Sequence, residues 1–297
     1  MKEKYNTSKH AIVYLLACVT FCQFGCKQKA KTIVPNGSVR FYEVYNIDEI
    51  GSNLMQANVV LSTILDSVNT HNSEKITAEN VHKIDSSTDK IQPDVNQRPL
   101  TKFFVYDGYL RDRKNQVVLN QNTGKPTYLS EIAGVMTKDT AILGKYLRMP
   151  AILDVLPQYT KFVFGSSIYD YDKNGKKRSL VGLYALKLMN LPGGAKLKGD
   201  HITDVAVDYD ERGRIAINIK LDPEGARIFR KLTRENIGQP IAITLNDYVY
   251  SAPNVLSEID GGNLQISGNF SVEDANKMAD LLKSAASADK ILYKTRL

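Results

Sequence analysis

The stretch from Ile202 to Ala288 constrains the fold most, because it is a complete run of clearly bounded elements. Residues 205–207 and 215–221 are β-branched and alternate apolar with polar, which predicts half-buried strands. The polar turn Asp210–Gly213 lies between them, with a glycine where φ can be positive. Asp222-Pro223 then has the form of a helix start, with Asp at the N-cap and Pro at the first helical position. A hairpin followed by a helix is therefore expected.

The remainder of this stretch is bounded equally well. The helix is expected to end at Asn236-Ile237-Gly238, since glycine favours the residue after a helix. Further strands are expected at 241–245, 249–251 and 263–267, and a second helix opens at Ser271 with Asp274 as a capping partner. The resulting order β-β-α-β-β-β-α predicts an α+β fold with a mostly antiparallel sheet and packed helices.

Short motifs in the same order give this stretch a family resemblance. The chain resembles SecD, the membrane subunit that assists protein export, over about 87 residues. The matching residues are Gly213-Arg214, Leu221-Asp222, Glu224-Gly225-Ala226, Leu232-Thr233, Asn236-Ile237-Gly238, Tyr250-Ser251-Ala252-Pro253, Ile266-Ser267-Gly268-Asn269-Phe270, Ala275 and Leu281-Leu282-Lys283-Ser284. A weaker similarity covers residues 39–65 and 134–189. The resemblance implies a fold like the SecD periplasmic domain and its head subdomain.

The chain departs from that family in its membrane segments. SecD proteins carry a first transmembrane helix, a further upstream periplasmic portion, and later membrane helices with carboxylates associated with proton coupling. No window of 18 or more apolar residues occurs in this sequence, so no such helix is expected. The expectation is a stand-alone domain that does not itself convert a proton gradient into work.

The N-terminus predicts a lipid anchor. Three lysines (Lys2, Lys4 and Lys9) precede an apolar segment at 11–21 that is too short to span a bilayer. The segment leads into Gln23-Phe24-Gly25-Cys26, which resembles a bacterial lipoprotein cleavage site, although Gln stands where such sites prefer Leu. Residues 1–25 are thus predicted to be a signal peptide and Cys26 the lipidated residue. A secretory peptide cleaved elsewhere and an uncleaved anchor are the alternatives.

Cysteine positions limit the chemistry of the mature chain. The three cysteines, Cys18, Cys22 and Cys26, all lie at or before the predicted cleavage site. No disulfide framework and no thiolate zinc site is therefore expected beyond Cys26.

The rest of the chain divides into a tether and two folded parts. We expect a tether at 26–38, an N-terminal α+β part at 39–200 and the head-like domain at 201–290. A polar stretch at about 69–99 is predicted to be a mobile insertion, with a short helix around 78–84. The other predicted strands lie at 39–45, 103–106, 161–164 and 181–188, and the predicted helices lie at 48–65, 138–148 and 151–156. A turn is predicted at Asp107-Gly108 and a hairpin tip at 170–178.

Composition excludes one class of partner and suggests another. The formal charge is +7, but acidic and basic residues are interspersed, so a nucleic-acid surface is not expected. Tyrosine is abundant at 16 residues and suits interfaces, since it offers apolar area and one hydroxyl. Tyr248, Tyr250 and Phe270, large and near turns, are the candidate protein contacts, with core packing as the favoured alternative.

The residues favour a non-enzymatic protein without cofactor or metal. Of the histidines after the signal peptide, His71 and His82 lie in the predicted insertion and His201 in a turn, and no HExxH, GxSxG, Walker or GxGxxG motif occurs. Asp204 and Asp208 could share a strand face as calcium ligands, but a solvated strand is the better interpretation. Gly261-Gly262 is interpreted as a loop rather than a phosphate cradle.

Two functions from different classes follow. The first is a lipid-anchored accessory of protein export in the bacterial envelope, facing the periplasm. It would bind exported polypeptide, the Sec translocon or SecD/SecF, and a homodimer could cover a bare sheet edge. The second is an envelope lipoprotein that reuses the domain for scaffolding or ligand binding, because fold does not fix function.

Overall fold

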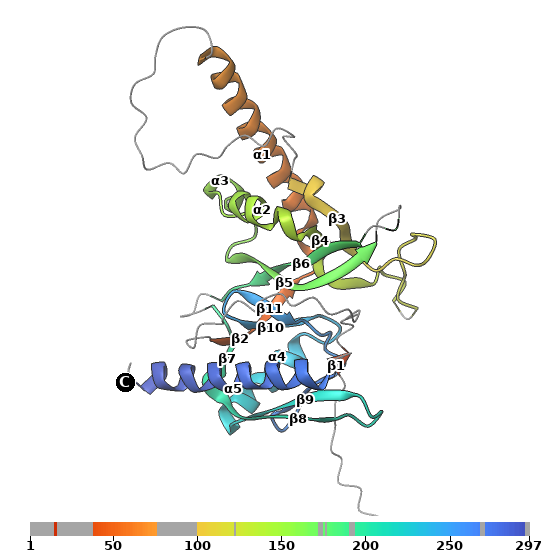
Figure 1. Ribbon diagram of the computed structural model, residues 1–297, viewed down its shortest axis with the longest axis vertical. Helices are drawn as coiled ribbons and strands as arrows, with labels where there is room; N and C mark the ends of the chain where they lie inside the picture. Colours follow the sequence, from red (N-terminus) through yellow and green to blue (C-terminus); the bar gives the residue numbers. More distant parts are fainter. Residues whose placement is uncertain are drawn as a thin grey trace, which may run out of the picture.

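A computed structural model describes residues 15–16, 38–75, 100–121, 123–171, 175, 177–189, 194–267 and 271–294. Its architecture is α+β with mostly antiparallel strand pairing, which confirms the predicted fold class (Figure 1). Three layers are stacked along the long axis, with a strand assembly between two helical layers (Figure 1). Among the described ranges, no helix combines the length and apolar character needed to cross a membrane.

The central layer is a sheet that closes into a small barrel. Its strand order is β3-β4-β6-β5-β11-β10-β2-β7. Strand β2 (Val39–Tyr45) pairs with β10 (Ile241–Leu245) and also with β6 (Lys177–Lys187), so β2, β10, β11 (Tyr248–Ser251), β5 (Thr160–Tyr171) and β6 form a ring. All five strands contribute to one buried cluster, which therefore fills the barrel: Tyr42, Val44, Val163, Leu186, Ala242 and Val249, with Tyr184 packed against it.

The upper layer covers β4 and β6 with helices. It contains α1 (Ile47–Lys75), η1 (Leu100–Phe103), η2 (Thr137–Asp139), α2 (Thr140–Tyr146) and α3 (Pro150–Leu153). Strands β3 (Phe104–Tyr109) and β4 (Tyr128–Met136) extend the sheet beyond the barrel on this side. Apolar side chains recur at helical spacing along one face of α1, and they pack on β4 and β6 in one buried core. These residues are Ile50, Leu54, Leu61 and Leu65.

The lower layer places two helices between sheets (Figure 1). The second sheet has the order β1-β12-β9-β8, formed by β1 (Leu15–Leu16), β12 (Asn263–Ser267), β9 (Ile215–Leu221) and β8 (Ile202–Tyr209). Helices α4 (Pro223–Glu235) and α5 (Val272–Lys294) pack between this sheet and β2 and β10 in a second core. Short elements β7 (Leu197–Lys198) and η3 (Gly199–His201) lead into β8.

The predicted β-β-α-β-β-β-α order of this region is confirmed in full. Asp222 caps α4 as predicted, since its side chain accepts a hydrogen bond from the Gly225 N–H at 2.7 Å. Gly213 and Gly238 have φ of 71° and 81°, in the left-handed region that the predicted turn and helix end require. The Ser271 hydroxyl accepts from the Asp274 N–H at 3.1 Å, which is half of the predicted capping box.

Two upstream predictions are corrected, and one strand was missed. Asp107-Gly108 does not turn the chain but lies within β3, at an irregularity in the β3–β4 register. Gly108 is needed for close backbone approach, because a Cβ there would lie 2.8 Å from the Glu131 carbonyl oxygen. Residues 69–75, assigned to the insertion, belong to α1, since no glycine or proline occurs between Leu65 and Lys75. Strand β4 was not predicted.

Several predictions lie outside the described residues. These are Cys26, Phe270, the helix around 78–84, and the signal peptide apart from Leu15 and Leu16. The division of the chain at residue 200 stays a prediction. The two predicted parts share the large sheet, because β2 from the first part pairs with β10 from the second.

Candidate functional site

The acidic residues on β8 do not form a calcium site. Asp204 pairs with Lys220 and Asp208 with Ala216, so the two carboxylates lie four residues apart along one strand. That spacing corresponds to about 13 Å, far beyond the roughly 5 Å that can separate two oxygens bound to one calcium ion at ~2.4 Å each. Within the described ranges, no group of three or more His, Cys, Asp or Glu side chains is arranged to hold a metal ion.

His201 takes part in capping a helix. Its Nδ1 lies 3.1 Å from Oδ1 of Asp222, the same oxygen that accepts the hydrogen bond from Gly225. Gly262 packs closely on α4, since a Cβ there would lie 2.6 Å from the Cβ of Ala226. The His201–Asp222 contact and the close packing of Gly262 on α4 both stabilise the local fold. This agrees with the interpretation of Gly261-Gly262 as a loop rather than a phosphate cradle.

The two described tyrosines among the predicted contacts form a ring pair. The centroids of Tyr248 and Tyr250 lie 5.0 Å apart at an interplanar angle of 70°. Tyr248 is 37% exposed, whereas Tyr250 packs against the lower core and burial raises its pKa. Beside them, Lys161 Nζ forms an ion pair with Asp247 Oδ1 at 2.5 Å. Tyr248 is therefore partly exposed and Tyr250 is largely packed, and a protein contact at either residue stays a prediction.

A polar cluster that joins β3, β4 and β6 was not predicted from the sequence. Tyr106 donates a hydrogen bond to Glu131 Oε1 at 3.1 Å, and Tyr184 also bonds this carboxyl. Burial raises the pKa of Glu131, and it raises the pKa of Tyr184 well above its ordinary value. Glycines make room for the rings: a Cβ at Gly134 would lie 2.0 Å from Tyr106 Cε1, and one at Gly165 would lie 2.5 Å from Tyr184 Cε2.

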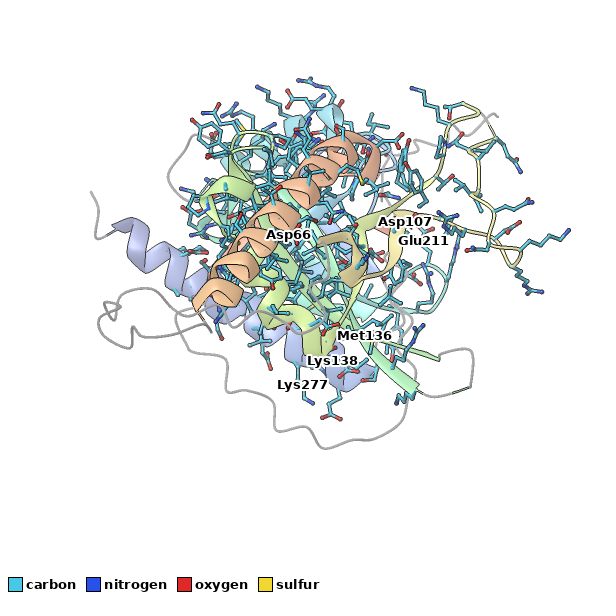
Figure 2. The ribbon with its side chains drawn as sticks, turned by 90° about the horizontal axis from the view of Figure 1, so that it is seen from above. Asp66, Asp107, Met136, Lys138, Glu211 and Lys277 are labelled. Atoms are coloured by element: carbon cyan, nitrogen blue, oxygen red, sulfur yellow. The ribbon has the colours of Figure 1, made fainter. Side chains whose placement is uncertain are left out.

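A groove of about 660 Å³ lies between α1 and β3. Figure 2 looks onto α1 and labels Asp107, which lies on the β3 side of this helix. Most lining side chains are apolar; the residues are Ile47, Gly51, Leu54, Met55, Thr101, Phe104, Val105, Tyr106, Asp107, Tyr109, Arg111 and Asn115. No sequence motif indicated this groove, because its lining comes from α1, η1, β3 and the residues that follow β3.

Tyrosine hydroxyls fix one wall of this groove. Asp48, at the start of α1, accepts a hydrogen bond from Tyr109 at 2.5 Å and another from Tyr128. These bonds hold the pKa of Asp48 below its ordinary value and raise the pKa of each tyrosine to about 12. The β3–β4 pair is thereby attached to the N-terminal turn of α1.

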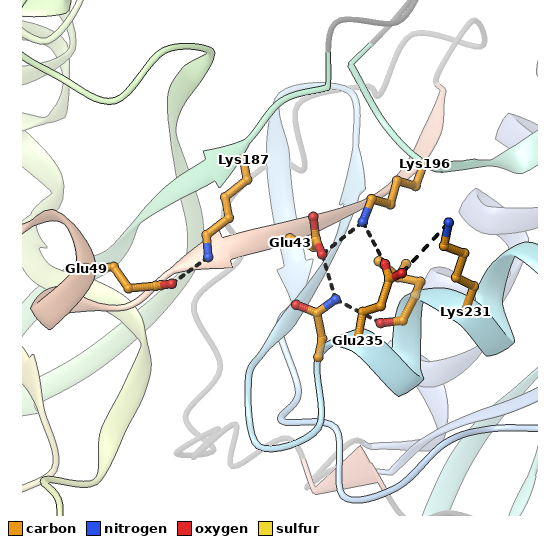
Figure 3. A network of polar contacts seen from close by, with 8 residues as sticks. Glu43, Glu49, Lys187, Lys196, Lys231 and Glu235 are labelled. Carbon is orange, nitrogen blue, oxygen red and sulfur yellow. Dashed lines mark hydrogen bonds and ion pairs between the residues drawn. The ribbon is translucent and has the colours of Figure 1, made fainter.

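An ionic network joins β2 to the lower layer (Figure 3). Glu43 on β2 accepts from Lys196 Nζ at 3.1 Å and from Asn236 Nδ2 at 2.7 Å. Lys196 also contacts Glu235 on α4 at 3.2 Å. The network connects the N-terminal part of the chain to the end of α4.

Comparison with known proteins agrees with the resemblance seen in the sequence. Residues 187–287 match the family described as SecDF, P1 head subdomain. The chain is 32% identical over 176 residues to protein translocase subunit SecD of Rhodothermus marinus, covering 59% of this chain and 27% of that protein. It is 44% identical over 94 residues to SecD of Leptotrichia buccalis, covering 32% and 23%.

A solved structure of the membrane component SecDF that enhances protein export is also similar. It is 19% identical, with a TM-score of 0.30, over 83% of this chain and 93% of that one. The chain spans roughly a quarter of the length of the two curated relatives above.

Proposed function

The chain carries a SecD periplasmic-type domain, and on that premise we propose that it is a SecD-related component of protein export. It acts in the bacterial cell envelope, facing the periplasm and held to a membrane by lipid on Cys26. It performs no chemistry of its own and contacts exported polypeptide or the Sec machinery.

The family match over residues 187–287 is the observation that carries this proposal. The matched range includes β8, β9, α4, β10, β11, β12 and most of α5, which share one buried core with Val39 and Phe41 of β2. The matched residues therefore share one core with a strand from upstream. Because fold alone does not fix function, the proposal needs a test in cells.

One feature of the lower layer and one of the barrel support contact with polypeptide. Leu15 and Leu16 of the chain's own apolar N-terminal segment pair in parallel with Ile266 and Ser267 of β12. The edge of β12 thus accepts an extended apolar segment, which is one of the recurrent modes of peptide recognition. The exposed Tyr248 supplies a second contact of the kind enriched at interfaces.

Export kinetics test the proposed role. In the bacterium that encodes the chain, deletion of its gene is expected to slow the maturation of pulse-labelled exported precursors, with cytoplasmic protein synthesis as the control. Re-expression of the full chain restores the rate. Unchanged maturation in the deletion strain would favour the alternative, an envelope lipoprotein used for scaffolding or ligand binding.

The lipid anchor has its own test. Cys26→Ser removes the thiol that the lipid would occupy, so incorporation of labelled palmitate and membrane retention are both expected to be lost. Cys22→Ser is the matched control, because it leaves the proposed lipidated residue in place. Equal palmitate labelling of both variants would place the anchor elsewhere.

A further inference from the structure

The groove between α1 and β3 runs along an edge of the large sheet. Strand β3 ends the order β3-β4-β6-β5-β11-β10-β2-β7, and no described strand pairs with its outer side. Phe104, Val105 and Tyr106 of this strand line the groove. An edge strand presents a row of backbone donors and acceptors, and natural proteins rarely leave such an edge beside apolar surface uncovered.

Gly51 leaves part of the groove empty. It lies inside α1 and lines the groove, yet a Cβ at this position would meet nothing within 4 Å. Glycine within a helix costs roughly 0.5–1 kcal/mol relative to alanine, and neither internal packing nor backbone conformation requires it here. One turn further on, Met55 lines the same groove and is 59% exposed. The helix thus has an open, apolar strip facing the edge strand.

The lining carries no uncompensated charge. Its charged residues are Asp107 and Arg111, and they pair with each other at 2.7 Å between Oδ2 and Nη2. Arg111 also donates from Nη1 to the Asn115 carbonyl oxygen at 3.2 Å. An occupant with its own charges would find no partner inside the groove, so charge matching favours an uncharged one.

We propose that this groove binds an extended, uncharged and apolar-rich segment of unfolded polypeptide. The backbone of the segment pairs with the outer edge of β3, and alternate side chains enter the space beside Gly51 and Met55. The six residues of β3 give an edge of roughly 20 Å, enough for a segment of about six residues. This inference deepens the proposed export function and rests on it for the source of the polypeptide.

Two other occupants are less consistent with the lining. Residues 76–99 of the chain rejoin the described structure at Leu100, beside the groove, but their sequence is rich in Asp, Lys, Asn and Gln. A second copy of the chain would bring its own β3 edge and would form a symmetric pair. If either of these occupied the groove, crosslinks from the groove would form within the chain or between its copies and not to an added peptide.

Peptide binding to the full chain in detergent tests the proposal. The probe is a fluorescein-labelled peptide of about ten alternating Val and Ser residues, compared with an Asp- and Lys-rich peptide of equal length. Binding of the Val/Ser peptide alone is expected. Gly51→Gln adds a long side chain at a position where a Cβ meets no neighbour, so it should occupy the groove and weaken binding by about tenfold or more, a change of about 1.4 kcal/mol. Ser52→Gln, an exposed position outside the groove lining, should leave binding unchanged.

Equal peptide affinity in Gly51→Gln and Ser52→Gln would overturn the proposal. A photoreactive residue at Met55 is expected to capture the Val/Ser peptide; capture of residues 76–99 or of a second copy would overturn it as well. The export role can be contradicted independently of the groove. If export stays normal after gene deletion while the peptide still binds at Met55, the export role is wrong and the peptide-binding groove stands.

Discussion

Asp289 of α5 and Arg40 of β2 form a largely buried ion pair, with 2.8 Å between Oδ2 and Nη1. Asp289 is 5% exposed, and the same oxygen accepts a hydrogen bond from the Val39 N–H at 3.0 Å. Gly199 approaches this carboxylate so closely that a Cβ there would lie 2.6 Å from it. One side chain near the end of the chain therefore anchors the first strand of the barrel.

Loss of this carboxylate should destabilise the whole fold. Asp289→Ala leaves the Arg40 guanidinium and the Val39 N–H without their partner in a mostly buried place, which we expect to cost roughly 3 kcal/mol. Chemical denaturation measures the change, and Asp280→Ala on the exposed side of the same helix is the control. If the two variants unfold at the same denaturant concentration, the pair does not hold β2 in place.

Gly134 and Gly51 should respond in opposite directions to alanine. Gly134→Ala places a methyl group 2.0 Å from the Tyr106 ring, so a loss of about 1–3 kcal/mol is expected. Gly51→Ala meets no neighbour and should stabilise the fold by about 0.5–1 kcal/mol. In the Tyr106→Ala background the cost of Gly134→Ala should largely disappear. The same loss at Gly134 with and without the ring would contradict this origin.

Glu131 should make stability fall as pH rises. Its raised pKa means that the folded state retains the proton above the ordinary value of 4.5, so the stabilising contribution is present in acid and is lost as pH rises through the folded value. Unfolding of the native chain and of Glu131→Gln is compared from about pH 4 to about pH 8. The native chain should lose stability relative to the variant over this range.

An exposed glutamate provides the control for this pH dependence. Glu211→Gln, in the turn between β8 and β9 (Figure 2), removes one negative charge without touching the Tyr106 and Tyr184 hydroxyls. If the stability of the native chain relative to Glu131→Gln stays constant or increases as pH rises, Glu131 does not titrate in this way.

Local signals explain why the C-terminal half was predicted well. Asp222-Pro223, Gly213 and Gly238 each mark a boundary by a conformational or capping requirement that operates within a few residues. The alternation in 215–221 determines one strand face directly, and β9 has those bounds. The element order of this region was therefore predictable without knowledge of its tertiary contacts.

The upstream errors and the groove arise from contacts between distant residues. Gly108 resembles a turn glycine in sequence, but its role is to let β3 approach Glu131. The Glu131 cluster joins β3, β4 and β6, and the groove joins α1 to β3, so neither has a sequence motif. Barrel closure depends on β2 pairing with both β10 and β6, which periodicity in one strand cannot reveal.

The most direct test of the export role is photocrosslinking in living cells. A photoreactive residue at Tyr248, the exposed member of the ring pair, is activated while exported proteins are pulse-labelled, and the adducts are purified through the chain. Thr203, on the exposed side of β8, serves as the control position. We expect adducts from Tyr248 with unfolded exported precursors or with subunits of the Sec machinery. Adducts with only the chain itself or one unrelated envelope protein, in cells whose export does not change on deletion, would contradict it.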